Sequence, residues 1–164
     1  MPEVETEHLL LAMLCEDNLG AGVLVRCGLS LDTLRSAVQK EMASGPAGRG
    51  RVTRLGPRAR RALDLAREEG EAMDPVYVGC EQLLLGLLRE KEGLAARVLA
   101  RLGVTPEGCR REIPSVGAWW SDVLEAEARL RDGDTPEKRR RLQEALAAYH
   151  AFIRQTPRLE ARPE

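Results

Sequence analysis

The side chains best suited to chemistry are four cysteines and two histidines, and their spacing does not assemble a reactive site. The cysteines include no C-x-x-C pair and the histidines are not at metal-ligand spacing, so neither a zinc site nor a disulfide framework is indicated. No serine, cysteine or carboxylate is arranged around His8 or His150 as a nucleophile with its base. We therefore predict no catalytic residue, no metal ligand and no cofactor, and hence a protein that is not an enzyme. The expected reduced thiols are Cys15, Cys27, Cys80 and Cys109.

A run of basic residues, Lys138–Arg141, could bind phosphates, and Trp119 and Trp120 could stack on the bases of a single-stranded nucleic acid. Acidic residues balance this run, because the segment 117–164 contains nine acidic and nine basic residues. A solvated helix face is therefore the favoured interpretation. A nucleic-acid-binding regulator that uses Arg49–Arg61 and Lys138–Arg141 is kept as an alternative.

The composition is that of a globular chain with a sizeable core, since 43% of the 164 residues are hydrophobic and 31% are charged. The net charge of -1 gives no overall field that would attract nucleic acid or an acidic membrane surface. The sequence shows neither an export leader nor an apolar run of about 18 residues. We expect a cytoplasmic protein that makes no membrane contact.

Two stretches of the chain are nearly the same sequence, and they determine how its elements are organised. Thr6–Gly28 reads TEHLLLAMLCEDNLGAGVLVRCG, and Cys80–Gly103 reads CEQLLLGLLREKEGLAARVLARLG, so that Glu7 aligns with Glu81. A repeated unit that cannot bury its own apolar face usually packs against its copy. We therefore predict an all-α fold built from two copies of one helical unit.

Leucines at helical spacing and well-placed capping residues predict the helices of both copies. Thr6 is expected as the first N-cap, Gly28 as a left-handed C-terminal residue, and Ser30 as the cap of the next helix. Pro57 suits the first turn of a helix, whereas Pro114 is expected to end one. The predicted helices cover residues 6–16, 19–27, 30–44, 57–73, 80–91, 93–102 and 105–113.

The sequence beyond residue 115 has a different composition and contains four of the five aromatic residues. Apolar residues at helical spacing on either side of the break 132–134 predict an antiparallel helical hairpin. We expect a double repeat over 1–115, with copy one at 4–44, a linker at 45–54 and copy two at 55–114, and then a hairpin with a frayed tail over 116–164. The aromatic residues, which are candidates for a partner interface, are Trp119, Trp120, Tyr149 and Phe152.

The segments TEHLLLAMLCE, LGPRARRALDLAREEGEAM, PVYVG and CEQLLLGLLREKEGLAARVLARLGV resemble the N-terminal double repeat of Clp-type AAA+ unfoldases. The likeness covers about residues 4–113. It implies an all-α, pseudo-twofold tandem repeat that binds protein segments or adaptors in protein quality control. No G-x-x-x-x-G-K-[ST] sequence is present, so the phosphate-binding loop of an ATPase is missing from this chain.

Copy one departs from the family pattern because it begins at its second helix. Only five residues precede Thr6, and none of them corresponds to the helix predicted over 57–73. Either the start of the chain has been trimmed, or the chain does without this helix and has an apolar groove in its place. Exposed apolar surface of that size tends to be covered by a partner. The hairpin of 116–164 is the expected cover, either in its own chain or in a second copy of a homodimer.

The resemblance implies that Glu7 and Glu81 correspond to the family glutamate that binds the guanidinium of phosphoarginine, through two parallel hydrogen bonds. Arg60 stands at the position of the family lysine that binds the phosphate. Gly56 stands at the position of a family threonine that assists this binding. In copy one, both helper positions belong to the missing helix. We therefore predict weak phosphoarginine binding at copy two only. The alternative role of these carboxylates is to stabilise the N-termini of their own helices.

His8 occupies the histidine position of the motif, but Gln82 replaces it in copy two, so we expect His8 to be structural. The expected partners are protein substrates or adaptors, with a Clp ATPase as one candidate. A stand-alone adaptor or regulator of a Clp protease, making contact through the hairpin, is the first alternative to a substrate-binding module.

Overall fold

The computed structural model describes residues 3–45, 54–72 and 78–155. Helices dominate these residues, and the one extended pairing among them is an isolated parallel bridge between Val4 and Leu55. The all-α prediction is confirmed. The predicted linker, the link before Cys80 and the C-terminal tail lie largely outside the described residues. The helices are α1 Thr6–Met13, α2 Leu19–Arg26, α3 Leu31–Ala43, α4 Pro57–Glu71, α5 Cys80–Glu90, α6 Leu94–Arg101, α7 Pro106–Arg131 and α8 Pro136–Arg154.

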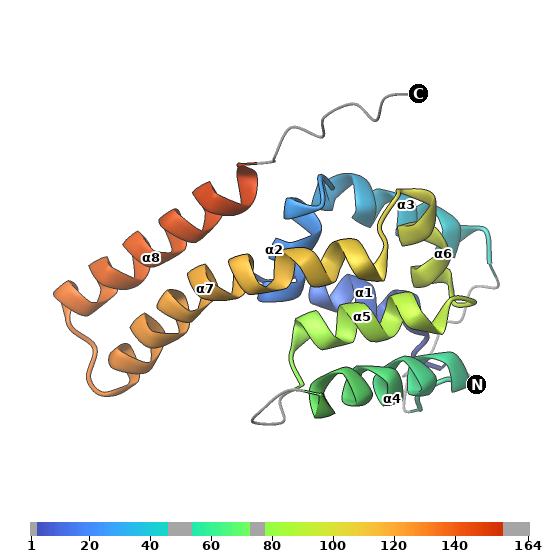
Figure 1. Ribbon diagram of the computed structural model, residues 1–164, viewed down its shortest axis with the longest axis horizontal. Helices are drawn as coiled ribbons and strands as arrows, with labels where there is room; N and C mark the ends of the chain where they lie inside the picture. Colours follow the sequence, from blue (N-terminus) through green and yellow to red (C-terminus); the bar gives the residue numbers. More distant parts are fainter. Residues whose placement is uncertain (1–2, 46–53, 73–77, 156–164) are drawn as a thin grey trace.

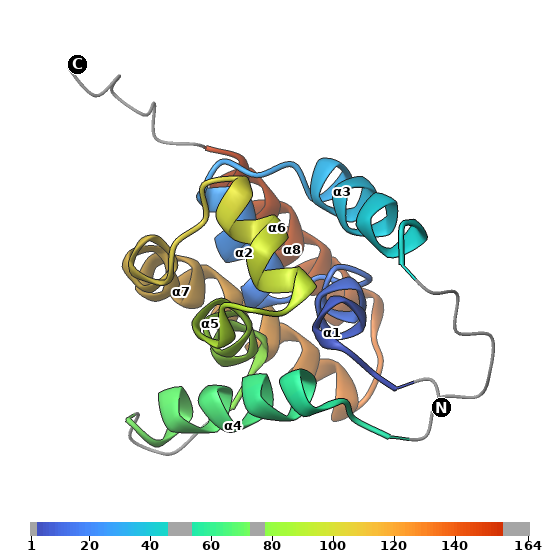
Figure 2. The same cartoon turned by 90° about the vertical axis from the view of Figure 1, so that its right-hand side faces the viewer.

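The two copies bury equivalent leucines in one shared core. Leu10 of α1 and its counterpart Leu84 of α5 are both 0% exposed, as are Leu24 of α2 and its counterpart Leu99 of α6. Figures 1 and 2 show α1 and α5 near the centre of the body, with α4 on the outer side of α5. The two copies of the repeat therefore pack together in the structure, as well as resembling each other in sequence.

The start of α1 differs from the prediction that Thr6 is its N-cap. Glu5 is the N-cap residue, and its backbone N–H donates to Nδ1 of His8 at 2.9 Å. In α5 the N-cap Gly79 donates in the same way to Oε1 of Gln82, at 2.7 Å. Histidine and glutamine are interchangeable here because each accepts this one hydrogen bond. The prediction that His8 is structural is thereby explained.

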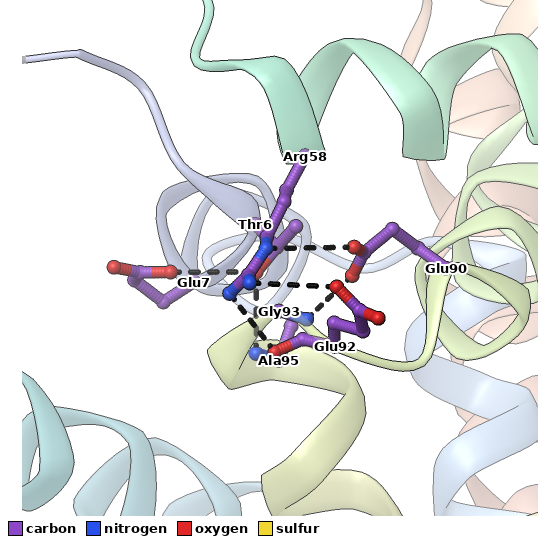
Figure 3. Close-up of polar contacts among 7 residues, drawn as sticks. All are labelled: Thr6, Glu7, Arg58, Glu90, Glu92, Gly93 and Ala95. Carbon is purple, nitrogen blue, oxygen red and sulfur yellow. Dashed lines mark hydrogen bonds and ion pairs between the residues drawn. The ribbon is translucent and has the colours of Figure 1, made fainter.

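Thr6 has a role that links the two copies. Its side chain is almost fully buried, and Oγ1 accepts a hydrogen bond from the backbone N–H of Ala95 at 3.3 Å, in the first turn of α6 (Figure 3). The first N–H groups of a helix lack partners within the helix. A residue of copy one therefore satisfies a helix end of copy two, which only the tertiary arrangement reveals.

The prediction that Pro114 ends a helix was wrong, because α7 continues through it to Arg131. A proline inside a helix removes one backbone hydrogen bond and costs about 3 kcal/mol. Val116 and Val123, both 0% exposed, anchor the helix just beyond the proline, and their burial offsets that cost. Since α7 runs across residue 115, the division of the chain into 1–115 and 116–164 stays a prediction.

The second part of α7 and the antiparallel α8 form the predicted hairpin, which extends beyond the body in Figure 1. The turn contains Gly133 at a φ of 112°, and Thr135 caps α8 by accepting a hydrogen bond from the backbone N–H of Lys138 at 3.3 Å. The break expected at residues 132–134 is therefore confirmed.

Close packing between α4 and α5 depends on small residues. A Cβ atom added to Gly86 of α5 would collide with the carbonyl oxygen of Ala62 and lie 2.8 Å from the backbone nitrogen of Ala66. Both obstacles are backbone atoms of α4, so they yield only if the two helices separate. Glycine at position 86 thus sets the distance between α4 and α5.

Replacing Gly86 with alanine should destabilise the protein by about 1–3 kcal/mol, because overpacking outweighs the better helix propensity of alanine. Gly117→Ala in α7 is the matched control. An added Cβ there meets nothing closer than Leu19 Cδ1 at 3.6 Å, so this variant should be as stable as the wild type or slightly more stable. Urea unfolding followed by circular dichroism measures both changes. Equal stability of the two variants would contradict the packing argument.

Candidate functional site

The hairpin packs in its own chain against α2. Tyr149 of α8 is 1% exposed, and its hydroxyl donates to the backbone carbonyl of Asn18 at 2.8 Å. Burial raises the pKa of Tyr149 well above its ordinary value. The ring needs the glycine at position 22, since a Cβ atom there would collide with the hydroxyl. This contact fixes the C-terminal half of α8 on copy one.

The structure brings the four predicted aromatic residues together in one group. Trp119 stacks on Phe152 with ring centroids 5.3 Å apart, and Trp120 lies 4.9 Å from Tyr149. The guanidinium of Arg26, from α2, lies 4.6 Å from the centre of the Phe152 ring. Much of this aromatic surface therefore packs within the protein and stabilises its fold. Trp119 keeps 39% of its surface exposed and is still accessible to a partner.

Two polar side-chain contacts lie beside the aromatic group, the first with the start of α7 and the second with α8 of the hairpin. Arg26 Nε lies 3.0 Å from Glu112 Oε2, and His150 Nε2 lies 2.8 Å from Asp17 Oδ1. The hairpin thus covers part of copy one. In the described part of the chain it covers α2 and not α1, because its packing partners are α2 and α5.

The two candidate carboxylates occupy equivalent first-turn positions but differ in exposure. Glu7 is half-buried and accepts a hydrogen bond of 3.4 Å from Oγ1 of Thr6. Glu81 is only 4% exposed, and burial raises its pKa, while its own backbone N–H and the Gln82 side chain oppose that rise. A ligand that uses Glu81 must therefore reach a largely covered carboxylate.

Arg60 lies exposed on α4 at an open depression of about 360 Å³. Its guanidinium donates to the backbone carbonyl of Leu55 at 3.4 Å. The bridge between Val4 and Leu55 positions this edge of the depression, and the backbone N–H of Val4 donates to the Arg54 carbonyl at 2.8 Å. Glu81 is not part of the lining. The depression is lined by Glu3, Arg54, Leu55, Pro57, Arg60, Arg61 and Asp64.

The structure explains why glycine stands at position 56. A Cβ atom at Gly56 would collide with the carboxylate of Glu5, whose Oε2 would lie 2.8 Å away. Burial, followed by the nearby charges of Glu7 and Glu3, raises the pKa of Glu5. A carboxylate therefore occupies the place expected for a threonine hydroxyl, and when ionised it repels a phosphate. Sequence reasoning did not identify Glu5 as part of this region.

Beside Glu5, the starts of α1 and α4 meet the turn between α5 and α6 (Figure 3). Arg58 of α4 donates to the Glu92 carbonyl at 3.1 Å and lies 3.9 Å from the carboxylate of Glu90. Glu90 in turn accepts the backbone N–H of Gly93 at 2.6 Å. Sequence reasoning missed this cluster, although Arg58 and Glu90 were visible at helix ends. It joins both copies and α4 at one point.

The cysteines and the remaining acidic residues do not assemble a metal centre in the described part of the chain, where no group of three or more potential ligands occurs. Cys109 is fully buried and Cys27 is half-buried, and neither is in a disulfide. No described helix is both long enough and apolar enough to cross a membrane.

Comparison with known proteins finds one matching family, described as the Clp repeat (R) N-terminal domain. The match covers residues 1–102 and again residues 76–156, so the second stretch reaches beyond residue 113 into the hairpin. The chloroplastic chaperone protein ClpC of Pisum sativum is 40% identical over 111 residues, which is 67% of this chain and 12% of that protein. Chaperone protein ClpC1 of Arabidopsis thaliana gives the same values.

A bacterial relative, chaperone protein ClpB of Oceanobacillus iheyensis, is 35% identical over 111 residues, which is 67% of this chain and 14% of ClpB. This chain therefore spans about one eighth of the length of these relatives.

Replacing Glu81 with glutamine should stabilise the protein at neutral pH, because the folded protein holds this carboxyl at a raised pKa. The wild-type group favours folding most below its ordinary pKa of 4.5, and this contribution is lost as the pH rises through the folded value. Each unit of pKa difference corresponds to about 1.4 kcal/mol. The advantage of Glu81→Gln should disappear below about pH 4.

Urea unfolding between pH 4 and 8 measures this difference, with Glu7→Gln as the control for losing a first-turn carboxylate. An advantage of Glu81→Gln that does not change with pH would contradict the assignment.

Proposed function

The chain belongs to the Clp repeat N-terminal domain family, and we propose on this basis that it is a non-enzymatic module that binds protein segments or adaptors in protein quality control. The relatives are chaperones, and this chain corresponds to a small part of each. The sequence has no G-x-x-x-x-G-K-[ST] motif, which supports a binding role without ATP hydrolysis.

The observation that carries this proposal is the open depression at the start of α4. Its lining combines apolar Leu55 and Pro57 with three arginines and two carboxylates. An extended polypeptide offers apolar side chains, charges of both signs and backbone polar groups, and this mixed surface can meet each of them. Protein segments with acidic side chains are favoured, because the arginines outnumber the carboxylates.

Phosphoarginine is a special case of such a segment, and weak binding at copy two remains our proposal. Arg60 is exposed and can reach a phosphate at the surface, but Glu81 is almost fully buried and Glu5 lies beside Gly56. None of the described residues before Glu7 is a counterpart of Arg60. Tight binding at two equivalent sites would therefore be unexpected.

A second candidate function, docking on a Clp ATPase or protease as an adaptor or regulator, is favoured by the hairpin. Trp119 and Leu124, both on α7, are 39% and 46% exposed. Large exposed apolar side chains are typical of interaction surfaces. The same surface would serve in a homodimer, which remains a further alternative.

Nothing in the basic run of α8 favours nucleic acid. Lys138 Nζ donates to two backbone carbonyls of the turn, at 3.1 and 3.0 Å, and Arg139 pairs with Asp134 at 2.6 Å. Arg140 and Arg141 both pair with Glu137. These cations already have partners, so the solvated-face interpretation of Lys138–Arg141 is the better supported one.

Reversing the charge at Arg60 and Arg61 together should weaken binding of an unfolded acidic protein such as casein about tenfold or more, through lost attraction and new repulsion. Arg97→Glu is the matched control, because Arg97 is exposed on α6, away from the depression. Fluorescence anisotropy of labelled casein measures the affinities. If the intact protein does not bind casein, or if the control weakens binding equally, the proposed site is wrong.

Trp119→Ala should reduce capture of a Clp unfoldase from the same source at least fivefold if the hairpin makes the contact, since tryptophan is a frequent interface anchor. Arg129→Ala, also exposed on α7, is the control. A pull-down with purified proteins measures the retained fraction. Absence of capture by the wild-type protein would exclude the adaptor role.

A further inference from the structure

A short pair of extended segments lies at the open depression, beside the start of α4 (Figures 1 and 2). The backbone N–H of Val4 donates to the Arg54 carbonyl at 2.8 Å, and the N–H of Gly56 donates to the Val4 carbonyl at 2.9 Å. These two hydrogen bonds make the isolated parallel bridge between Val4 and Leu55. Residues 54–56 therefore use one of their two sides to pair with the segment that contains Val4.

The backbone of Leu55 presents its polar groups on the other side. The N–H and C=O groups of successive residues in an extended segment point in alternate directions. Since the Arg54 carbonyl and the Gly56 N–H point toward Val4, both groups of Leu55 point away from it. The Leu55 carbonyl accepts a hydrogen bond from the guanidinium of Arg60, and both residues line the depression. This side of the segment, called here the Leu55 edge, therefore faces the depression.

The polar groups of the Leu55 edge are available for pairing with a further strand. Among the described residues, no backbone carbonyl accepts a hydrogen bond from the Leu55 N–H. The Leu55 carbonyl has a second lone pair, and its bond to Arg60, at 3.4 Å, is longer than the typical distance of about 2.9 Å. A strand edge with unpaired N–H and C=O groups is a template for another chain.

The charges beside the Leu55 edge suit an acidic segment. Arg60 and Arg61 are exposed near the start of α4, and both line the depression. The ion pairs that α4 makes with other described residues use Arg58, Glu68 and Glu69. An incoming carboxylate can therefore bind Arg60 or Arg61 without displacing an existing ion pair.

We propose that the depression binds an extended segment of a partner protein as an added β-strand, which pairs with the backbone N–H and C=O of Leu55. An acidic side chain of that segment then binds Arg60 or Arg61, and an apolar side chain contacts Pro57. This inference rests on the proposed function and deepens it, because it names the conformation of the bound segment. Backbone pairing suits a binder of unfolded protein, since every residue except proline offers the same N–H and C=O groups.

The test uses a fluorescein-labelled peptide of about eight residues, alternating glutamate and valine, as the probe for the intact protein. A strand that binds in one direction with its glutamates toward the arginines presents only one alternate set of amides to Leu55. N-methylation of that set should weaken binding about tenfold or more, whereas N-methylation of the other set should change the affinity less than about twofold. Fluorescence anisotropy measures the affinities.

The variant Leu55→Pro tests the same contact from the side of the protein. Proline removes the N–H that points away from Val4 and leaves the N–H groups of Val4 and Gly56 in place. This variant should bind the peptide about tenfold more weakly than Leu55→Val, which keeps the N–H and an apolar side chain. Circular dichroism checks that both variants are folded, and the N-methylated peptides test the wild-type protein independently.

Absence of peptide binding, or equal affinities of the two N-methylated peptides, would overturn the inference. So would equal peptide affinities of folded Leu55→Pro and Leu55→Val. A dimer in sedimentation experiments that Leu55→Pro abolishes would assign the Leu55 edge to a second copy of this chain, and would also overturn it.

Casein binding is measured separately with the wild type and with the variant that reverses the charges at Arg60 and Arg61. Casein binding that depends on these arginines, without the alternate-amide pattern in the peptide, removes this inference alone. Absence of casein binding removes the proposed function, whatever the peptide shows.

Discussion

The structure depends on one constraint, which is that the leucine-rich helices α1 and α5 bury their apolar side chains in a core that both copies share. Leu10 and Leu84 are fully buried in this core, where α1 packs against helices of copy two and α5 packs against α1 and α2 of copy one. The Thr6 hydroxyl adds a directional contact to this apolar packing. It accepts a hydrogen bond from the Ala95 backbone N–H, which fixes copy one against the first turn of α6. A buried polar bond of this kind restricts the register in which two helical units can pack.

The same constraint explains where the two copies stop being alike. In copy two, α4 completes the unit and Gly86 allows it to approach closely, whereas the counterpart of Gly86 on α1 is the exposed Ala12. The equivalent carboxylates differ accordingly, because Glu81 is buried and Glu7 is not. A pseudo-twofold sequence thus produces two different surfaces.

The hairpin belongs to the body more closely than its change of composition indicates. α7 continues through Pro114, and α8 returns to α2, where the Tyr149 hydroxyl reaches the Asn18 carbonyl. Most of the aromatic surface is buried in these contacts, whereas Trp119 remains partly exposed. The hairpin therefore combines an internal packing role with a smaller surface for contact with other proteins.

The sequence by itself determined the helices of both copies, the repeat, the left-handed Gly28 and the hairpin turn, because periodicity and capping act between residues a few positions apart. Only the tertiary structure decided that Pro114 stays within a helix, that Thr6 caps α6, and that Glu5 occupies the space beside Gly56. Each of these depends on atoms brought together from distant parts of the chain. The burial of Glu81 has the same origin, since local pattern places a carboxylate on a helix turn but does not show what will cover it.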